Sequence, residues 1–464
     1  MRQLVSVIGT MLEEMSVDFA YVGHSAVGEE LNRLAGEIHH GLTQHLSAIC
    51  MQALRFARRT GDRARRSSSC LSSTNFVVGH WLCGWGSLDK SFSNVNPRNN
   101  TMKATKKLYD LGQSLWLDNI TRDLLKSGTL RGYIDELSVT GLTSNPTIFD
   151  HAIKNSPDYD TGIGQKLKEG KSGEGLFFEL ALEDLTQAAD LFRPIYDRTC
   201  GVDGWVSLEV SPLLAHDTKT TLAEARDLHA RAARPNLFIK IPGTKEGLPA
   251  IEEAIFAGIP INVTLLFSHE HYVAAAEAYL RGIERRIDAG LKPEVGSVAS
   301  LFISRWDAAV TGKVPDALND QLGIAIGKRT YKAYCDLIAS PRWRRVFNAG
   351  GRPQRLLFAS TGTKDPKASD VLYIKELAAP LTVNTMPEGT LKAFANHGEL
   401  GATVPADGGN CETVLAQFAK AGVDCDALAT KLQDEGATSF VKSWNELMAV
   451  IASKSASLQK AAKS

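Results

Sequence analysis

The sequence predicts an α/β protein whose strands close into a (β/α)8 barrel, the TIM barrel. Short apolar runs of β type recur along the chain, and the stretches between them mostly have the apolar spacing of helices. Most of these runs also carry a polar side chain that would be costly to bury without a purpose. The eight runs are residues 115–120, 137–146, 205–210, 236–244, 261–267, 298–305, 355–364 and 381–387.

Helical segments are expected between the runs. Residues 217–233 and 269–289 have apolar side chains at roughly helical spacing, and Gly-Leu-Pro at 247–249 opens another helix. Strands that alternate with helices form parallel sheets, and eight such units close into a barrel. In this fold the side chains at the carboxyl ends of the strands converge on one site.

Lys240 is the most informative residue, because it stands in the apolar run Leu-Phe-Ile-Lys-Ile-Pro. Lysine rarely enters such a strand unless it is paired or held neutral. The apolar neighbours Phe238, Ile239 and Ile241 would favour the neutral amine by desolvation, and a neutral lysine attacks carbonyl carbon. The run therefore predicts a Schiff-base enzyme, and the alternative is a strand-end lysine that reaches solvent past Pro242.

The other runs supply the polar groups of a catalytic ring around this lysine. Successive strands deliver carboxylates, amides and hydroxyls, and chance placement of such a set is improbable. The candidates are Asp118, Asn145, Glu209, Asn262, Thr264, Ser300 and Ser360.

Six motifs, in order, resemble the transaldolases of the pentose phosphate pathway in their longer bacterial-type form. The motifs are Ser-Leu-Trp-Leu-Asp-Asn, Thr-Ser-Asn-Pro-Thr-Ile-Phe, Ser-Leu-Glu-Val-Ser-Pro, Phe-Ile-Lys-Ile-Pro-Gly-Thr, Ile-Asn-Val-Thr-Leu-Leu-Phe-Ser and Thr-Val-Asn-Thr-Met-Pro. The resemblance covers residues 102–464 and implies a class I aldolase barrel with extra carboxyl-terminal helices. It also implies transfer of a dihydroxyacetone unit from sedoheptulose 7-phosphate to glyceraldehyde 3-phosphate, giving erythrose 4-phosphate and fructose 6-phosphate.

The resemblance implies a catalytic role for four residues. Lys240 would form the imine, and Asp118 would take the proton of the C4 hydroxyl as the C3–C4 bond breaks. Glu209 would shuttle protons through a water beside Thr264 during imine formation. The alternatives are that Asp118 caps the helix at 121–123, and that Glu209 only forms a buried ion pair with Lys240.

The resemblance also implies how the substrate is bound. Asn145 and Asn262 would hold hydroxyls of the dihydroxyacetone unit, with Ser300 on its C1 side. Arg305 matches a phosphate-binding arginine, since a guanidinium fork suits phosphate oxygens.

A departure from the short transaldolases concerns the second phosphate-binding arginine. That arginine lies two positions after the serine that corresponds to Ser360, where this chain has Gly362. We expect Lys364 to substitute for it, and the alternative is a solvated loop lysine.

Composition limits the classes of function. With a net charge of +0 and a pI of about 7.2, the chain shows no basic surface typical of nucleic-acid binding, and no run approaches the ~20 apolar residues of a membrane helix. The amino terminus lacks a signal pattern and has early acidic residues, so we expect a cytoplasmic protein. The seven cysteines include no Cys-x-x-Cys pair, and we expect no disulfide, metal or cofactor. Sugar phosphates are the expected partners, bound by a monomer or homodimer.

The first hundred residues differ in composition, with nine arginines and one lysine before Met102. Residues 1–66 include an amphipathic pattern that resembles the phosphoacceptor helix of sensor histidine kinases around His39. His40 stands where those kinases have an acid, and no ATP-binding domain follows, so a non-functional fragment is favoured over a passive helix or a working phosphoacceptor. Residues 67–101 are Ser-rich and predicted to be a disordered linker.

Two other functions stay open on the sequence. A fructose 6-phosphate aldolase shares the lysine and the barrel, but the full set of polar residues and the length after the seventh strand favour transaldolase. A phosphorelay module would instead carry its phosphate on His39.

Overall fold

The computed structural model of the protein describes residues 102–461, which form a closed barrel of eight strands in sequential order. All neighbouring strands are parallel, including β1 and β8, which close the barrel. The strands are β1 (Ser114–Asp118), β2 (Val139–Thr143), β3 (Trp205–Glu209), β4 (Leu237–Pro242), β5 (Ile261–Leu266), β6 (Ser297–Phe302), β7 (Gln354–Ala359) and β8 (Val383–Met386). The predicted (β/α)8 barrel is confirmed, and every strand overlaps a run that the sequence marks, although β1, β6 and β7 begin one residue before theirs.

Helices surround the barrel, and those predicted from apolar spacing are present as α11, α12 and α13. The α-helices are α5 (Ala104–Asp110), α6 (Arg122–Lys126), α7 (Thr129–Leu137), α8 (Pro146–Asn155), α9 (Asp160–Lys168), α10 (Gly173–Arg198), α11 (Thr218–Ala232), α12 (Gly247–Phe256), α13 (His269–Asp288), α14 (Ser304–Val310), α15 (Leu322–Ile338), α16 (Pro341–Asn348), α17 (Leu372–Glu376), α18 (Glu388–His397), α19 (Cys411–Lys420) and α20 (Cys425–Ala461). Short 3-10 helices are η1 (Pro157–Tyr159), η2 (Pro212–Leu214) and η3 (Asp316–Leu318).

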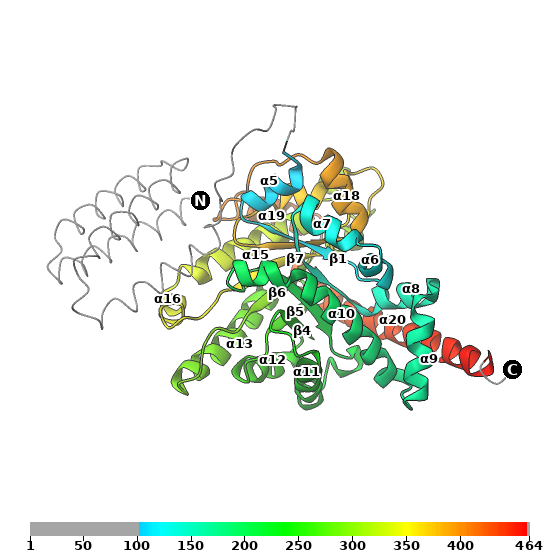
Figure 1. Ribbon diagram of the computed structural model, residues 1–464. Helices are drawn as coiled ribbons and strands as arrows, with labels where there is room; N and C mark the ends of the chain where they lie inside the picture. The colour runs from blue at the N-terminus through cyan, green and yellow to red at the C-terminus, as the bar shows by residue number, and fades with distance from the viewer. Residues whose placement is uncertain (1–101, 462–464) are drawn as a thin grey trace, which may run out of the picture.

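The predicted extra carboxyl-terminal helices are α19 and α20, which follow the last βα unit. Figure 1 shows α20, in red, running beside α8 and α9, and it also contacts α10 and the end of β5. Within residues 102–461, no helix combines the length and the apolar character needed to cross a membrane. The predicted phosphoacceptor-like helix and the Ser-rich linker lie outside the described residues.

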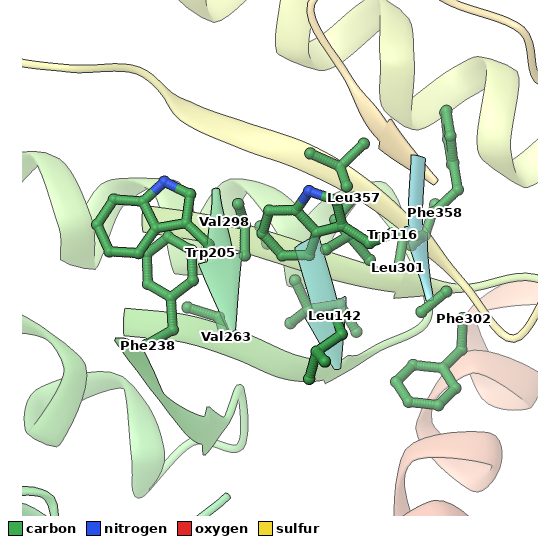
Figure 2. Close-up of a cluster of buried hydrophobic side chains, with 14 of the residues drawn as sticks. Trp116, Leu142, Trp205, Phe238, Val263, Val298, Leu301, Phe302, Leu357 and Phe358 are labelled. Atoms are coloured by element: carbon green, nitrogen blue, oxygen red, sulfur yellow. The ribbon is translucent and has the colours of Figure 1, made fainter. Parts of the chain in front are cut away.

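Figure 2 shows a layer of buried hydrophobic side chains that includes the large aromatic rings of Trp116, Trp205 and Phe238. The rings of Trp205 and Phe238 stack with centroids 3.9 Å apart, and Trp116 lies 6.1 Å from Phe238. Gly141 makes room for this layer, because a Cβ there would lie 2.7 Å from Nε1 of Trp116. Trp205 begins β3 and Phe238 is the second residue of β4, so these two rings lie toward the amino ends of the strands, away from Glu209 and Pro242 at the carboxyl ends.

Strand alternation explains how Lys240 comes to lie inside the barrel. Successive side chains of a strand point to opposite faces, so Lys240 shares the interior face with Phe238, while Ile239 and Ile241 face the helices. All of β4 is buried. A one-residue shift of register would exchange the lysine for an isoleucine, so the apolar pattern of β4 fixes the lysine inside.

Candidate active site

A cavity of about 650 Å³ opens at the carboxyl ends of the strands, within the usual size range of small-molecule sites. It collects side chains from β1, β2, β4, β5, β6, β7 and β8, from segments that follow several of these strands, and from α20. The predicted residues that line it are Asp118, Asn145, Lys240, Thr264, Ser300, Arg305, Ser360 and Lys364. The remaining two, Glu209 and Asn262, do not line the cavity but hydrogen-bond to the lining residues Lys240 and Ser300.

Lys240 is held at the bottom of the cavity by two oxygen atoms. Its Nζ donates to Oε2 of Glu209 at 3.0 Å and to the carbonyl oxygen of Ser144 at 2.8 Å. The residue is 5% exposed, so it does not reach bulk solvent past Pro242, and that alternative is wrong. A primary amine fixed in a small polar cavity is the arrangement that imine chemistry requires.

Glu209 lies beside Lys240 because β3 and β4 pair in a register that sets these two residues side by side. Burial raises the pKa of the Glu209 carboxyl, while the ammonium of Lys240 lowers it and the charge of Asp118 raises it. The net shift is upward, so Glu209 binds a proton more readily than an exposed glutamate. It is therefore suited to accept the lysine proton and return it.

Asp118 ends β1 and lines the opposite side of the cavity floor. Burial raises the pKa of its carboxyl, and the charge of Lys240, a hydrogen bond from Thr143 and the charge of Lys364 lower it in part. The helix that follows is capped by Thr121, whose Oγ1 accepts from the backbone N–H of Leu124 at 3.1 Å. Asp118 is not the helix cap, so the capping alternative is wrong and its carboxylate is available in the cavity.

Thr264 of β5 and Ser300 of β6 carry the hydroxyl groups of these two strands that lie nearest to the floor of the cavity. Within residues 102–461 the buried Oγ1 of Thr264 has no hydrogen-bond partner, which is unusual for a buried hydroxyl and leaves it free for water or substrate. Ser300 donates its hydroxyl proton to Oδ1 of Asn262 at 2.7 Å, and Nδ2 of Asn262 donates to Ser207 at 3.2 Å. Asn262 is thus held beneath Ser300. The sequence alone does not show that Asn262 lies below the residues that line the cavity.

Asn145 stands at the start of α8 and caps it. Its Oδ1 accepts from the backbone N–H of Ile148 at 3.1 Å, and Pro146 occupies the first turn. Because the oxygen is used by the helix, the Nδ2 hydrogens are the groups left to meet a ligand in the cavity.

Arg305 lies over the ring of Phe302, 5.4 Å from its centroid, and burial lowers the pKa of its guanidinium. Among residues 102–461 it forms no salt bridge within 4.0 Å. A cation–π contact is worth about 0.5–2 kcal/mol. The side chain is half-buried, and the charge of Glu435, beyond salt-bridge distance, raises its pKa in part. The guanidinium is therefore suited to an anionic ligand.

Arg122 also lines the cavity, but its charge is already neutralised. Its guanidinium donates to Asp184 at 2.9 Å and to Glu183 at 2.7 Å, and it lies over the ring of Tyr159. A ligand anion would compete with two carboxylates here. Arg305 is therefore the better anion site of these two arginines.

The loop after β7 brings Ser360, Gly362 and Lys364 to the same side of the cavity as Arg305. Ser360 has a left-handed backbone with φ of 54°, and its hydroxyl lies 3.0 Å from that of Ser304, at the start of α14. Lys364 is exposed at the cavity edge, and its charge acts on Asp118. Lys364 thus lines the cavity although its side chain is exposed, and its charge lowers the pKa of the Asp118 carboxyl.

The lining residues that the sequence reasoning missed include Thr143, Thr385 and Phe440. Thr143 donates to Asp118 at 2.8 Å, and its hydroxyl lies 2.7 Å from that of Thr385 on β8. Phe440 comes from α20, and its ring lies 6.5 Å from that of Phe302. Thr143 lies two positions after Gly141 in β2, and this spacing places both on the same face of the strand, so it could have identified Thr143 as a lining residue. Nothing in the sequence indicates that α20 contacts the open end of the barrel.

The sequence from residue 115 to 451 matches the protein family described as Transaldolase/Fructose-6-phosphate aldolase. A transaldolase of Thermobifida fusca is 45% identical over 352 residues, which cover 74% of this chain and 96% of the relative. A transaldolase of Parafrankia sp. is 43% identical over 359 residues, covering 75% and 97%. A transaldolase of Thiobacillus denitrificans is 41% identical over 358 residues, covering 75% and 100%. The chain therefore belongs to the Transaldolase/Fructose-6-phosphate aldolase family.

Proposed function

We propose that the protein is a transaldolase of the non-oxidative pentose phosphate pathway, acting through a Schiff base on Lys240. It transfers a dihydroxyacetone unit from sedoheptulose 7-phosphate to glyceraldehyde 3-phosphate, which gives erythrose 4-phosphate and fructose 6-phosphate. The observation that carries the proposal is the buried Lys240–Glu209 pair at the floor of a polar cavity. The match to transaldolases along nearly their whole length supports it.

Imine formation begins with proton transfer from Lys240 to Glu209, which lie 3.0 Å apart. The neutral amine attacks C2 of the ketose, and a proton moves from the attacking nitrogen to the carbonyl oxygen to give a neutral carbinolamine. Glu209 then returns its proton, through a water held by Thr264, to the carbinolamine hydroxyl. Water leaves and a protonated imine remains.

Asp118 is the base for carbon–carbon cleavage. It takes the proton of the C4 hydroxyl, C4 becomes an aldehyde carbon, and the electrons of the C3–C4 bond move through C3 to the iminium nitrogen. The product is a neutral enamine and a free aldose phosphate. A raised pKa makes the Asp118 carboxylate a stronger base than an ordinary aspartate, which favours this step. The acceptor aldehyde then reacts by the reverse sequence.

Neutral polar groups hold the dihydroxyacetone unit. Ser300 uses its proton on Asn262, so its oxygen is free to accept a hydrogen bond from a substrate hydroxyl. Asn145 has the opposite polarity, because its oxygen caps α8 and its Nδ2 can donate. Groups without charge bind the hydroxyls without opposing or trapping the positive imine.

The phosphate is bound between Arg305 and Lys364, with Ser360 between them. Arg305 supplies a half-buried guanidinium with no salt bridge among the described residues, and Lys364 supplies a second positive charge in place of the arginine that the short transaldolases have where this chain has Gly362. Because both cations lie away from the imine, they bind substrate and transition state equally and mainly lower KM.

The proposal also covers the setting of the enzyme. It acts on sugar phosphates in the cytoplasm, as a monomer or homodimer, without nucleic acid or membrane. The balanced composition, with 52 basic and 52 acidic residues, supports the absence of nucleic-acid binding. Analytical ultracentrifugation of the purified protein tests the oligomeric state.

A donor-splitting assay distinguishes transaldolase from fructose 6-phosphate aldolase. With fructose 6-phosphate alone, a transaldolase retains the dihydroxyacetone unit on Lys240 and turns over only after erythrose 4-phosphate is added. Release of free dihydroxyacetone at the same rate with and without the acceptor would overturn the proposal in favour of the aldolase.

A further inference from the structure

We propose that Gln433 of α20 is a positioning residue that fixes Thr264 and the loop after Lys240 for imine formation. The inference rests on the proposed Schiff-base function and extends it to a helix that carries none of the predicted catalytic residues. Gln433 does not line the cavity, so it acts through the backbone of other residues.

The strand that carries Thr264 is irregular at this point. Its register with β6 shifts between Val263 and Leu266, and Leu265 between them has φ of 60°. A left-handed conformation is strained for a bulky side chain and persists only where neighbouring structure holds it. Such bulges re-aim a side chain next to a site, and the residue that this one directs is Thr264.

The loop after Lys240 approaches this bulge closely. The backbone N–H of Gly243 donates to the carbonyl oxygen of Thr264 at 2.7 Å. A Cβ at position 243 would lie 2.3 Å from Cδ2 of Leu266, so a larger residue there would force the Leu266 side chain to shift. The end of β4 and the bulge of β5 therefore form one unit, three residues from the imine-forming lysine.

Gln433 joins the two halves of this unit. Its Nε2 donates to the carbonyl oxygen of Leu265 at 2.9 Å and to that of Gly243 at 3.2 Å. A side-chain amide nitrogen has two hydrogens, so both bonds form at once. The carbonyl oxygens of the strained residue Leu265 and of Gly243 thus accept hydrogen bonds from the same side-chain amide. Removing that amide would leave both carbonyl groups without this hydrogen bond.

The helix has other anchors, which separates this role from simple docking. Lys454 donates to the carbonyl oxygen of Ser156 at 2.8 Å and to Asp160 at 2.6 Å, and Thr147 bonds Ser443 at 2.8 Å. Trp444 packs against Phe177 and Phe178. Removing the amide of Gln433 alone therefore leaves α20 in place.

The test compares two variants of similar size with a control elsewhere on α20. Gln433→Met keeps the volume without donors, and Gln433→Lys keeps donors at similar reach. Lys454→Met removes an anchor of the helix far from Thr264. Each is assayed for exchange of the C2 oxygen of fructose 6-phosphate with labelled water, which reports imine formation alone, and for kcat, KM and melting temperature.

Gln433→Met should slow oxygen exchange and kcat about tenfold to a hundredfold, as expected when a catalytic group shifts by about 1 Å, with KM nearly unchanged. Gln433→Lys should recover much of the exchange rate, and Lys454→Met should retain it. Normal exchange in Gln433→Met, or equal losses in all three variants, would overturn the positioning role. Absence of exchange in the unmodified enzyme would instead overturn the Schiff-base function. If Gln433→Met does not fold, loss of exchange in a folded Gln433→Glu, which cannot donate when ionised, decides the question, and normal exchange there overturns the role.

Discussion

Nζ of Lys240 lies 3.0 Å from Oε2 of Glu209, and both side chains are 7% exposed. The pair is set by the register of β3 and β4, so it is built into the sheet and does not depend on a loop. A buried ion pair adds little to stability, because desolvation of two charges largely cancels their attraction. Its value is chemical, since one proton can move between amine and carboxylate without a change in the net charge of the site.

Replacing Glu209 with glutamine should slow imine formation, because an amide cannot accept the lysine proton. The expected loss in kcat is about 10² to 10⁴, the usual contribution of a general acid–base group. Rapid-quench trapping with borohydride measures the imine directly. Normal imine formation in this variant would assign Glu209 to a structural ion pair only.

Replacing Asp118 with alanine should lower kcat by about 10² to 10⁴ while the imine still forms. The reason is that Asp118 acts on the C4 hydroxyl, after the lysine has reacted. Steady-state kinetics and borohydride trapping together measure the two effects. A variant with near-normal turnover would remove Asp118 from the role of base.

Asp118→Asn should also raise the melting temperature at neutral and alkaline pH. Burial raises the pKa of Asp118 in the folded protein, so ionisation costs stability that is fully present below the unfolded-state pKa and lost as pH rises through the folded-state value. The amide avoids that cost. Melting curves across pH should show the advantage shrinking as pH falls through the pKa of Asp118, and an advantage that does not vary with pH would contradict this account.

Thr143→Val should move the acidic limb of the kcat profile to higher pH. The Thr143 hydrogen bond lowers the pKa of Asp118, so its loss raises that pKa and requires a higher pH to ionise the base. Thr140→Val is the matched control on the same strand, because Thr140 does not line the cavity. Equal profiles for the two variants would show that Thr143 does not tune the base.

Lys364→Ala should mainly raise KM for phosphorylated substrates and leave kcat nearly unchanged. Transfer to an unphosphorylated aldehyde should change little. Lys367→Ala is the control, since Lys367 is exposed in the same loop and does not line the cavity. Equal losses on phosphorylated and unphosphorylated acceptors would mean that Lys364 supports the loop instead of binding phosphate.

The sequence predicted the barrel because β4 and its neighbours combine apolar runs with one polar residue each, and strand alternation then decides which side chains face inward. The same reasoning identified Lys240 and Asp118, whose positions within single strands are enough to mark them. The alternative of Asp118 as the helix cap failed because α6 begins at Arg122, so the capping position directly before it is Thr121.

Other features depend on contacts between distant parts of the chain. Gln433 and Phe440 lie about 170 and 140 positions from the residues they contact at β5 and β6, and no local pattern pairs a late helix with the barrel mouth. The depth of Asn262 beneath Ser300 depends on the stagger of β5 against β6 in the same way. Sequence spacing gives the face on which a residue lies, but the layer is set by tertiary packing.

Borohydride reduction in the presence of fructose 6-phosphate, followed by peptide mass spectrometry, tests the central claim most directly. The protein should lose transfer activity and carry one reduced dihydroxyacetone unit on the peptide that contains Lys240, and Lys240→Arg should carry none. Full activity after reduction, or an adduct on a different lysine, would contradict the Schiff-base mechanism.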